Sequence, residues 1–509
     1  PDLVLGDPFH EVRPNVRAGS AYVVSGADGR LLLELDGEDD LERFGSAVAA
    51  PGDVNGDGVG DFLVGAPNAV TMTSFGFLIG GAFLFSGADG NLLFEMNGTL
   101  RYSLFGSVVA APGDVDGDGV PDLLVGAPRA VPQLHGSGLV QVFSGRDGRL
   151  LLSLEGTPGI KDLGSSAAGA GDFDHDGHAD FVVGAPATEV GGRNGTGAVF
   201  LFSGRDGQVL LRLNRPEGSG SFGSSLDAAG DVDGDGTMDF IIGAPDTSPF
   251  GTAFQGSAFV VSGRLGRLLY RFDGTGDYEF FGTSVAGPGD VDGDGVPDIL
   301  VGTPNSEPGE VFLGGSASLF SGADGSLERR FLGEEPGDSL GSSVSRLGDL
   351  DADGLPEFMA GSPGSGGNGS PGLGRILVLG LNPILTASAE DLSLSAGGSI
   401  DLQLRFRPED AFAVYRVLAS AHGTGPALLQ GLSVPLAPDD LFRDSLHGRL
   451  PVQAVAFSGL LDGTAGAFPR LVVPPGSLPA KLTGRTLHFA AVTGHLDLSS
   501  VAVPVTFLP

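Results

Sequence analysis

The strongest constraint on this chain is an internal repeat. The string GDVDGDGVPDLLVGAP at 113–128 recurs with substitutions at a spacing of about 59 residues. The first aspartate of each complete copy is Asp53, Asp114, Asp172, Asp231, Asp290 or Asp349. Because each copy must form the same local structure, the chain is expected to be an array of equivalent units rather than a single irregular domain.

In every repeat, short apolar runs alternate with segments that contain glycine or aspartate. Runs such as 61–67, 197–204 and 208–213 are rich in Val, Leu and Phe and bounded by Gly or Asp, which is typical of strands. One period contains four such runs, and four strands in a period of this length predict a propeller blade. The Gly-x-Pro ending occurs seven times, at Gly6, Gly65, Gly126, Gly184, Gly243, Gly302 and Gly361. The fold class expected for the first part of the chain is therefore an all-β, seven-bladed β-propeller.

Each complete repeat carries an acidic loop of the form D-x-[DN]-x-D-G-x-x-[DE]. Ca²⁺ takes six to eight oxygen ligands, and alternate side chains of a turning loop can point to one centre. Positions one, three, five and nine would supply side-chain oxygens, and position seven a backbone carbonyl. The metal ligands expected are Asp53, Asn55, Asp57, Val59, Asp61; Asp114, Asp116, Asp118, Val120, Asp122; Asp172, Asp174, Asp176, His178, Asp180; Asp231, Asp233, Asp235, Thr237, Asp239; Asp290, Asp292, Asp294, Val296, Asp298; and Asp349, Asp351, Asp353, Leu355, Glu357.

Other calcium loops share the opening of this pattern but not its continuation. An EF-hand needs an acid at position twelve, where the second loop has Val125, and a dockerin-type loop leads into a helix, where this chain has an apolar strand. Magnesium seldom uses cages made only of protein ligands. The cofactor expected is Ca²⁺, about six ions with one per loop, in a structural role.

These motifs resemble the FG-GAP repeats of integrin α subunits and of bacterial extracellular proteins. The resemblance covers residues 1–382 and rests on a Phe-Gly or Leu-Gly pair, the acidic loop and the Gly-x-Pro ending. It implies a seven-bladed propeller with calcium-binding hairpin loops. It also implies a ring normally closed by an N-terminal strand that completes the last blade.

The repeat pattern is incomplete at both ends of the array. The first repeat has its second, third and fourth strands, and the last has its first three. The missing strands could come from a segment upstream of residue 1, or from a neighbouring copy by strand addition, which would give a homo-polymer.

Residues 383–509 lack the period but alternate apolar and polar positions in eight short runs, which predicts a β-sandwich-like C-terminal domain. The loops between the second and third strands of the blades vary most and several are apolar, among them 77–79 and 311–313. They could pack on neighbouring blades or on the second domain, or form a face opposite the calcium loops that binds a protein or glycan ligand.

Composition excludes several classes of function. The net charge of −35 argues against nucleic acid as a partner, and the absence of an apolar run of about 18 residues argues against a membrane span. Cysteine is absent, so disulfides and thiolate metal sites are excluded. No G-x-S-x-G or H-E-x-x-H motif is present. The expected function is a non-catalytic adhesion or structural protein, secreted or on a surface of bacterial type. The alternative is a secreted enzyme that acts on carbohydrates or other polymers.

Overall fold

The computed structural model describes residues 2–380, except 15, 28, 70–77, 131–135, 191–194, 215–219, 249–252, 308–310, 351–353 and 365–373, together with the strands between residues 384 and 508. The chain divides into two compact units, Pro1–Leu379 and Gly380–Pro509. Each unit is described by itself. No helix long and apolar enough to cross a membrane occurs in the part of the chain that the structure describes.

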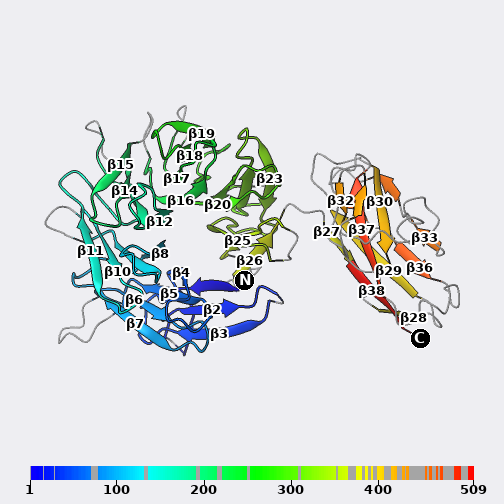
Figure 1. Ribbon diagram of the computed structural model, residues 1–509, viewed down its shortest axis with the longest axis horizontal. Coiled ribbons are helices and arrows are strands. Elements are labelled where there is room, and N and C mark those ends of the chain that lie inside the picture. The colour runs from blue at the N-terminus through cyan, green and yellow to red at the C-terminus, as the bar shows by residue number, and fades with distance from the viewer. Residues whose placement is uncertain are drawn as a thin grey trace. The chain divides into compact units, whose positions relative to one another are not determined.

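The first unit is a ring of seven antiparallel sheets, which confirms the predicted seven-bladed β-propeller (Figure 1). Blades 2 to 6 each contain four strands that pair in sequence order, and blades 1 and 7 each contain three. The strands of blades 1 to 3 are β1 Leu3–Asp7, β2 Ser20–Val24 and β3 Leu31–Asp36; β4 Ala47–Gly52, β5 Asp61–Ala66, β6 Gly81–Phe85 and β7 Leu92–Asn97; and β8 Val108–Gly113, β9 Asp122–Ala127, β10 Leu139–Phe143 and β11 Leu150–Glu155.

The remaining blades repeat this plan. Their strands are β12 Ser166–Gly171, β13 Asp180–Ala185, β14 Ala198–Phe202 and β15 Val209–Asn214; β16 Ser225–Gly230, β17 Asp239–Ala244, β18 Ser257–Val261 and β19 Leu268–Asp273; β20 Ser284–Gly289, β21 Asp298–Thr303, β22 Ser316–Phe320 and β23 Leu327–Leu332; and β24 Ser343–Arg346, β25 Phe358–Ser362 and β26 Arg375–Leu379.

The core lies between neighbouring blades. The second strand of blades 2 to 6 is buried at all six positions, because both of its faces pack against other blades, and this explains its continuous apolar sequence. Leu124 and Val140 of blade 3 pack against Phe181 and Val183 of blade 4 in one such core. The fourth strand, by contrast, is largely exposed, and β11 has the burial pattern eiieie, where e is exposed and i half-buried. The second strands therefore supply much of the packing between blades.

The glycines of the two signature motifs meet at the blade interfaces. A β-carbon on Gly65 of blade 2 would clash with the carbonyl oxygen of Gly106, the glycine of the Phe-Gly pair in blade 3. Gly106 itself has a φ of 85°, a conformation that favours glycine. The Phe-Gly pair and the Gly-x-Pro ending are thus two halves of one backbone-to-backbone contact, which explains why they keep the same period.

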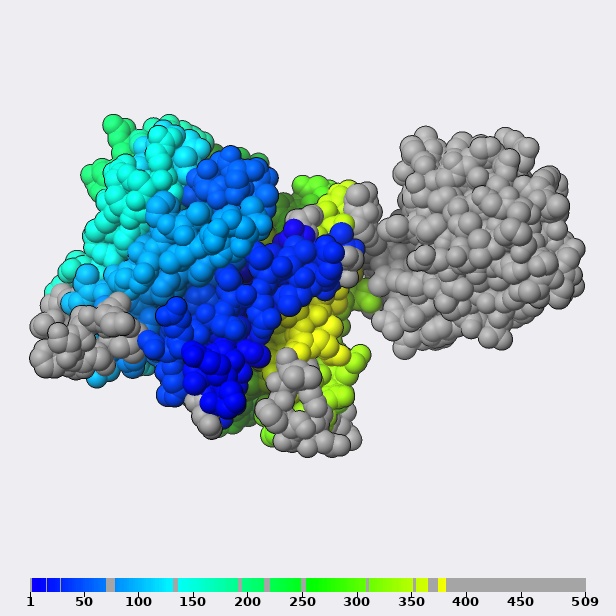
Figure 2. All heavy atoms as spheres, turned by 90° about the horizontal axis from the view of Figure 1, so that it is seen from below, coloured from blue at the N-terminus to red at the C-terminus, as the bar shows by residue number. Residues whose placement is uncertain are grey.

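Blades 1 and 7 lie side by side, so that the dark blue and the yellow segments adjoin in both views (Figures 1 and 2). In blade 1 the sheet order is β1-β2-β3, and in blade 7 it is β24-β25-β26. These sheets match the strands that the sequence predicted for the first and last repeats.

The second unit is also built from β-strands. One sheet has the order β27-β29-β36-β33 with β35 beside β29, a second has the order β28-β38-β37-β30-β34, and β31 pairs with β32. The bounds are β27 Ile384–Ala387, β28 Asp391–Ser393, β29 Gly398–Arg405, β30 Val414–Ser420, β31 Ala427–Leu429, β32 Leu432–Val434, β33 Gln453–Val455, β34 Ser458–Leu460, β35 Gly466–Ala467, β36 Arg470–Val473, β37 Thr486–Thr493 and β38 Val503–Leu508. The sandwich-like packing of these sheets stays a prediction.

Candidate metal centres

The acidic loops occupy equivalent places in the ring. Each connects the first strand of a blade to the second, as between β8 and β9 in blade 3. Because this connection always turns at the same end of a blade, the loops share one end of the propeller. Asp114 and Asp122 mark the start and end of the loop in blade 3, and the other blades follow the same register.

The aspartate at position one accepts the hydrogen bonds that hold the loop in its turn. In blade 3, Asp114 Oδ1 accepts hydrogen bonds from the backbone N–H groups of Gly117 and Asp118 at 2.8 and 3.0 Å, and its Oδ2 accepts one from Gly119 at 2.8 Å. The same pattern holds around Asp53 and Asp290. The carboxylate therefore holds the turn in the shape that directs the following side chains inward.

The aspartate at position nine ties the loop to a different part of the blade. Asp122 Oδ2 accepts hydrogen bonds from the N–H groups of Val115 at 2.7 Å and Asp116 at 3.1 Å, while its Oδ1 accepts one from Gly145 at 2.9 Å. Gly145 lies in the turn between the third and fourth strands. This aspartate is fully buried, so it is a structural anchor as well as a candidate ligand. Its counterparts Asp61, Asp180, Asp239 and Asp298 also bridge the loop and this turn.

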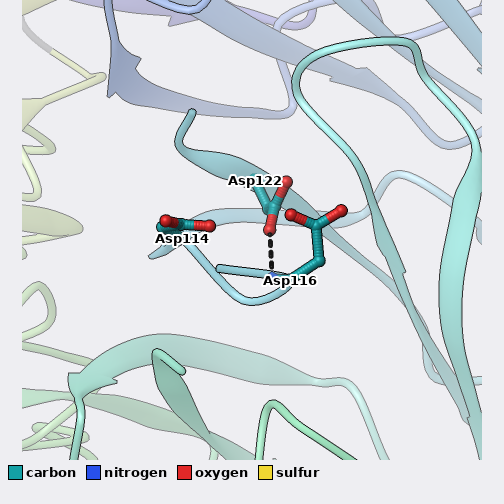
Figure 3. A group of neighbouring side chains, drawn as sticks. All are labelled: Asp114, Asp116 and Asp122. Carbon is teal, nitrogen blue, oxygen red and sulfur yellow. Dashed lines mark hydrogen bonds between the residues drawn. The ribbon is translucent and has the colours of Figure 1, made fainter. Parts of the chain in front are cut away.

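Carboxylate oxygens converge in several loops. In each of four groups, one oxygen per residue lies within 4.8 Å of the others: Asp114, Asp116 and Asp122; Asp172, Asp174 and Asp180; Asp231, Asp233 and Asp239; and Asp290, Asp292 and Asp294. Figure 3 shows the first group, with the carboxylates of Asp116 and Asp122 side by side. Within the described part of the chain, Asp116 Oδ1 is buried and has no hydrogen-bond partner. Hard oxygen donors with an unsatisfied buried lone pair fit a cation of the calcium type, so these clusters could bind metal ions.

The position-five carboxylates of blades 3 to 5 have other partners in this structure, and their role as ligands stays a prediction. Among the described residues, the three-carboxylate groups of those blades contain positions one, three and nine, and Asp118, Asp176 and Asp235 lie outside them. Asp118 Oδ1 instead accepts a hydrogen bond from the N–H of Val120 at 2.9 Å, and its Oδ2 lies 2.8 Å from Nε of Arg146. In blade 6 the position-five residue Asp294 does join the group.

Arginines of the turn between the third and fourth strands offset part of the loop charge. Arg149 lies 2.6 Å from Asp116 in blade 3, and Arg267 lies 3.1 Å from Asp233 in blade 5. Arg205 is 3.9 Å from Asp176 in blade 4. The corresponding turns of blades 2 and 6 read SGADGN and SGADGS and contain no arginine. The loops therefore differ in net charge although their motifs are alike.

The first, third and sixth loops have individual features. Asn55 replaces an aspartate at position three, and its side chain bonds Asp57 through Nδ2 to Oδ2 at 2.9 Å. His178 at position seven points its Nδ1 to the carbonyl oxygen of Val115 at 2.8 Å, which links the third loop to the second. In the sixth loop Glu357 accepts a hydrogen bond from Leu350 N–H at 2.6 Å, and Asp351 and Asp353 lie outside the described residues. That position seven binds a cation through its carbonyl stays a prediction.

Burial governs the acidity of the position-nine carboxyls. It raises the pKa of Asp122 and Asp239 to about 6 and the pKa of Asp298 to about 7, although the backbone N–H donors oppose the shift. Burial and the adjacent Asp292 also raise the pKa of Glu328. The folded chain thus holds these carboxylates in places where a compensating cation would favour their ionised form.

Two further acids lie near these loops, and of these the motif did not predict Glu328. Asp2 follows the position-nine pattern without a complete loop, since it accepts a hydrogen bond from the N–H of Gly26 at 3.1 Å in the blade 1 turn. Glu328, on β23, joins Asp292 and Asp298 in a fifth group of convergent oxygens. The sequence signal for Glu328 was an acid at a place in the repeat where the other blades have leucine.

Comparison with known proteins agrees with this geometry. A family model described as FG-GAP repeat matches residues 44–77, 105–143, 163–202, 222–261 and 281–313. Integrin alpha-5 of Xenopus laevis is 34% identical over 226 residues, which cover 40% of this chain and 20% of the relative. Integrin alpha-V of Gallus gallus is 32% identical over 224 residues, covering 40% and 20%. Human integrin alpha-IIb is 40% identical over 167 residues, covering 30% and 16%.

The matched region is thus about a fifth of the length of the first two relatives. The similarity lies in the repeats and does not extend to the whole of those proteins. The resemblance inferred from the motifs is confirmed.

Proposed function

We propose that this chain, which carries FG-GAP repeats of the integrin-α type, is an extracellular, calcium-stabilised, non-catalytic propeller with a role in adhesion or in a surface structure. The observation that carries the proposal is the recurrence of converging carboxylates at equivalent loops of one ring of blades. Similarity to integrin α chains supports a ligand-related rather than a catalytic role. The domain division proposed is a propeller over 1–382 and a β-sandwich-like domain over 383–509.

The cofactor proposed is Ca²⁺, about six ions, one in each acidic loop. The five residues assigned to each loop from the sequence are the proposed ligands. Support comes from the oxygen-only donor sets and from Asp116 Oδ1, which is buried without a hydrogen-bond partner. When bound, each ion would neutralise carboxylates that otherwise repel one another, and would hold the loop against the turn beside it. Calcium would therefore act as a structural clamp at one end of every blade that has a complete loop.

The proposed partner surface is the opposite end of the ring. There Phe254 stacks on Phe280 with ring centroids 5.7 Å apart and lies 5.8 Å from Tyr278. Phe254, Tyr278 and Phe312 remain 42%, 56% and 62% exposed, although such large apolar groups are usually covered. This face would bind a protein or glycan ligand, since aromatic rings serve both kinds of contact.

We also propose that the chain self-assembles by strand addition. Among the described residues β26 pairs with β25 alone, whereas the third strand of the other blades pairs on both edges. Ile376 and Val378 are 39% and 46% exposed at positions that correspond to the fully buried Ala317 and Leu319. A strand from a second copy would satisfy this edge and cover both side chains. Electron microscopy of the purified chain would show fibres if it does so, and single rings if it does not.

The calcium proposal is tested on the full chain after passage over a chelating resin. Native mass spectrometry should count several bound Ca²⁺ ions, and calorimetry should show a melting temperature that rises with calcium. At free calcium ten times the Kd, each filled site contributes about 1.4 kcal/mol. Magnesium at the same concentration is the control and should stabilise less. Identical melting curves in millimolar calcium and in excess EGTA would overturn the proposal.

A further inference from the structure

Glu328 occupies a position that is leucine in the other blades. In blades 1 to 6 the pairing between the third and fourth strands shifts register at the same place, and the residue left over at this β-bulge is Glu328 in blade 6. Its counterparts in blades 1 to 5 are Leu32, Leu93, Leu151, Leu210 and Leu269. Bulges re-aim a side chain relative to the regular strand. The chemistry of one blade therefore changes at a position whose backbone geometry stays the same.

Three of the five counterparts of Glu328 pack against the blade cores, while Leu32 and Leu210 are 39% and 37% exposed. Leu93, Leu151 and Leu269 each pack against a buried apolar cluster. A carboxylate in such a place loses hydration and must find a donor or a cation. Among the residues that the structure describes, Glu328 Oε2 is buried and has no hydrogen-bond partner. The Glu328 carboxylate therefore lacks the donor or cation that it needs in this place, whereas a leucine would need neither.

The surroundings of Glu328 are uniformly acidic. One carboxylate oxygen each from Glu328, Asp292 and Asp298 lie within 4.8 Å of one another. The ionisable groups that act on Glu328 are Asp298, Asp292 and Asp294. In blade 3 the turn arginines Arg146 and Arg149 contact the loop, but the same turn positions in blade 6 are Ala323 and Ser326.

We propose that Glu328 is an additional ligand for the divalent cation of the fifth loop, and that this loop is the tightest calcium site in the chain. The proposal rests on the calcium-binding function proposed above. Two groups of converging oxygens, Asp290 with Asp292 and Asp294, and Asp292 with Asp298 and Glu328, share Asp292, so the fifth loop has one carboxylate more than its motif supplies. The ionisable groups that act on Glu328 are all acidic, and calcium affinity rises with the number of charged ligands. The fifth loop would be the last to lose its ion as free calcium falls.

The test compares Glu328→Leu, which restores the residue of the other blades, and Glu328→Gln, which keeps the shape, with Asp324→Asn as the matched control. Asp324 is an exposed acid in the preceding turn, and its Oδ1 accepts a hydrogen bond from Ser326 N–H at 2.8 Å, which asparagine can retain. Calcium is titrated into each metal-free full-length protein in competition with a chelator of known affinity. Both Glu328 variants should weaken the tightest site by about tenfold or more, and Asp324→Asn should change it far less.

Melting temperatures supply a second, independent measurement. In EGTA, Glu328→Leu should melt at a higher temperature than the wild type, because it removes a half-buried carboxylate from an acidic cluster. Calcium should then stabilise this variant less than it stabilises the wild type. If the Glu328 variants and Asp324→Asn have the same calcium titration, the inference about Glu328 is wrong even though calcium binds. If the wild type binds no calcium, the proposed function itself has failed.

Discussion

The buried aspartate at position nine should be essential for folding whether or not calcium is bound, and Asp122→Ala tests this. Asp122 is fully buried and accepts three backbone hydrogen bonds, from Val115 and Asp116 of its own loop and from Gly145 of the next turn. Alanine would remove the acceptor for all three and detach the loop from the turn.

The magnitude follows from the three donors. A buried polar group that loses its partner costs about 1–3 kcal/mol. Three such losses predict about 3 kcal/mol as the lower bound for Asp122→Ala, since water can replace only part of the acceptor in a buried loop. This is a large share of the 5–15 kcal/mol that is typical of a folded domain. Asp122→Asn keeps one oxygen and should fall between alanine and the wild type.

The assay is denaturant unfolding of the full chain, in EGTA and in millimolar calcium, with Asp118→Ala as the control. Asp118 is a predicted ligand of the same loop, but its side chain is partly exposed and pairs with Arg146 near the surface. Exposed pairs contribute about 0–1 kcal/mol. Asp118→Ala should therefore have little effect in EGTA and reduce only the gain from calcium, whereas Asp122→Ala should destabilise the protein in both.

The reasoning would be refuted by one result in particular. If Asp122→Ala in EGTA unfolds within about 1 kcal/mol of the wild type, the three backbone bonds do not stabilise the fold, and position nine acts only as a ligand. Equal losses for Asp118→Ala and Asp122→Ala in EGTA would lead to the same conclusion.

Three other predictions concern the loops and the blade interfaces. The pKa of Asp122 is raised to about 6 and that of Asp298 to about 7 in the folded chain, so the stability they contribute is complete below the unfolded pKa near 4 and lost as pH rises through 6–7. The melting temperature in EGTA should therefore fall as pH rises from 5 to 8, and calcium should reduce this dependence on pH. His175 has a φ of 62° where most loops have glycine, so His175→Gly should raise stability by up to about 1 kcal/mol in urea unfolding. Gly65→Ala should lower it by about 3 kcal/mol in the same assay, because its methyl group would meet the carbonyl of Gly106; an unchanged midpoint would show that the blades can separate slightly.

Much of the ring could be predicted because its information is local and repeated. The apolar run that ends at Gly65 and the acidic loop before it recur in register, so each copy supports the same interpretation. The seven blades lie where the motif predicted them, and the aspartates at positions one and nine converge in blades 3 to 5. In the second unit, alternation indicated strands, but it could not reveal that β28 pairs with β38 in parallel across more than a hundred residues.

The sequence by itself determined the strands of each blade, the turns between them and the acidic character of each loop, since these depend on residues that lie within a few positions of one another. Only the tertiary structure decided which groups the carboxylates of each loop contact. Asp122 meets Gly145, and Asp116 meets Arg149, only because the blade folds its two turns together. The same geometry brings Glu328 into the fifth loop. Contacts between segments some thirty residues apart depend on the register of the intervening strands, and a motif that spans nine residues does not contain that register.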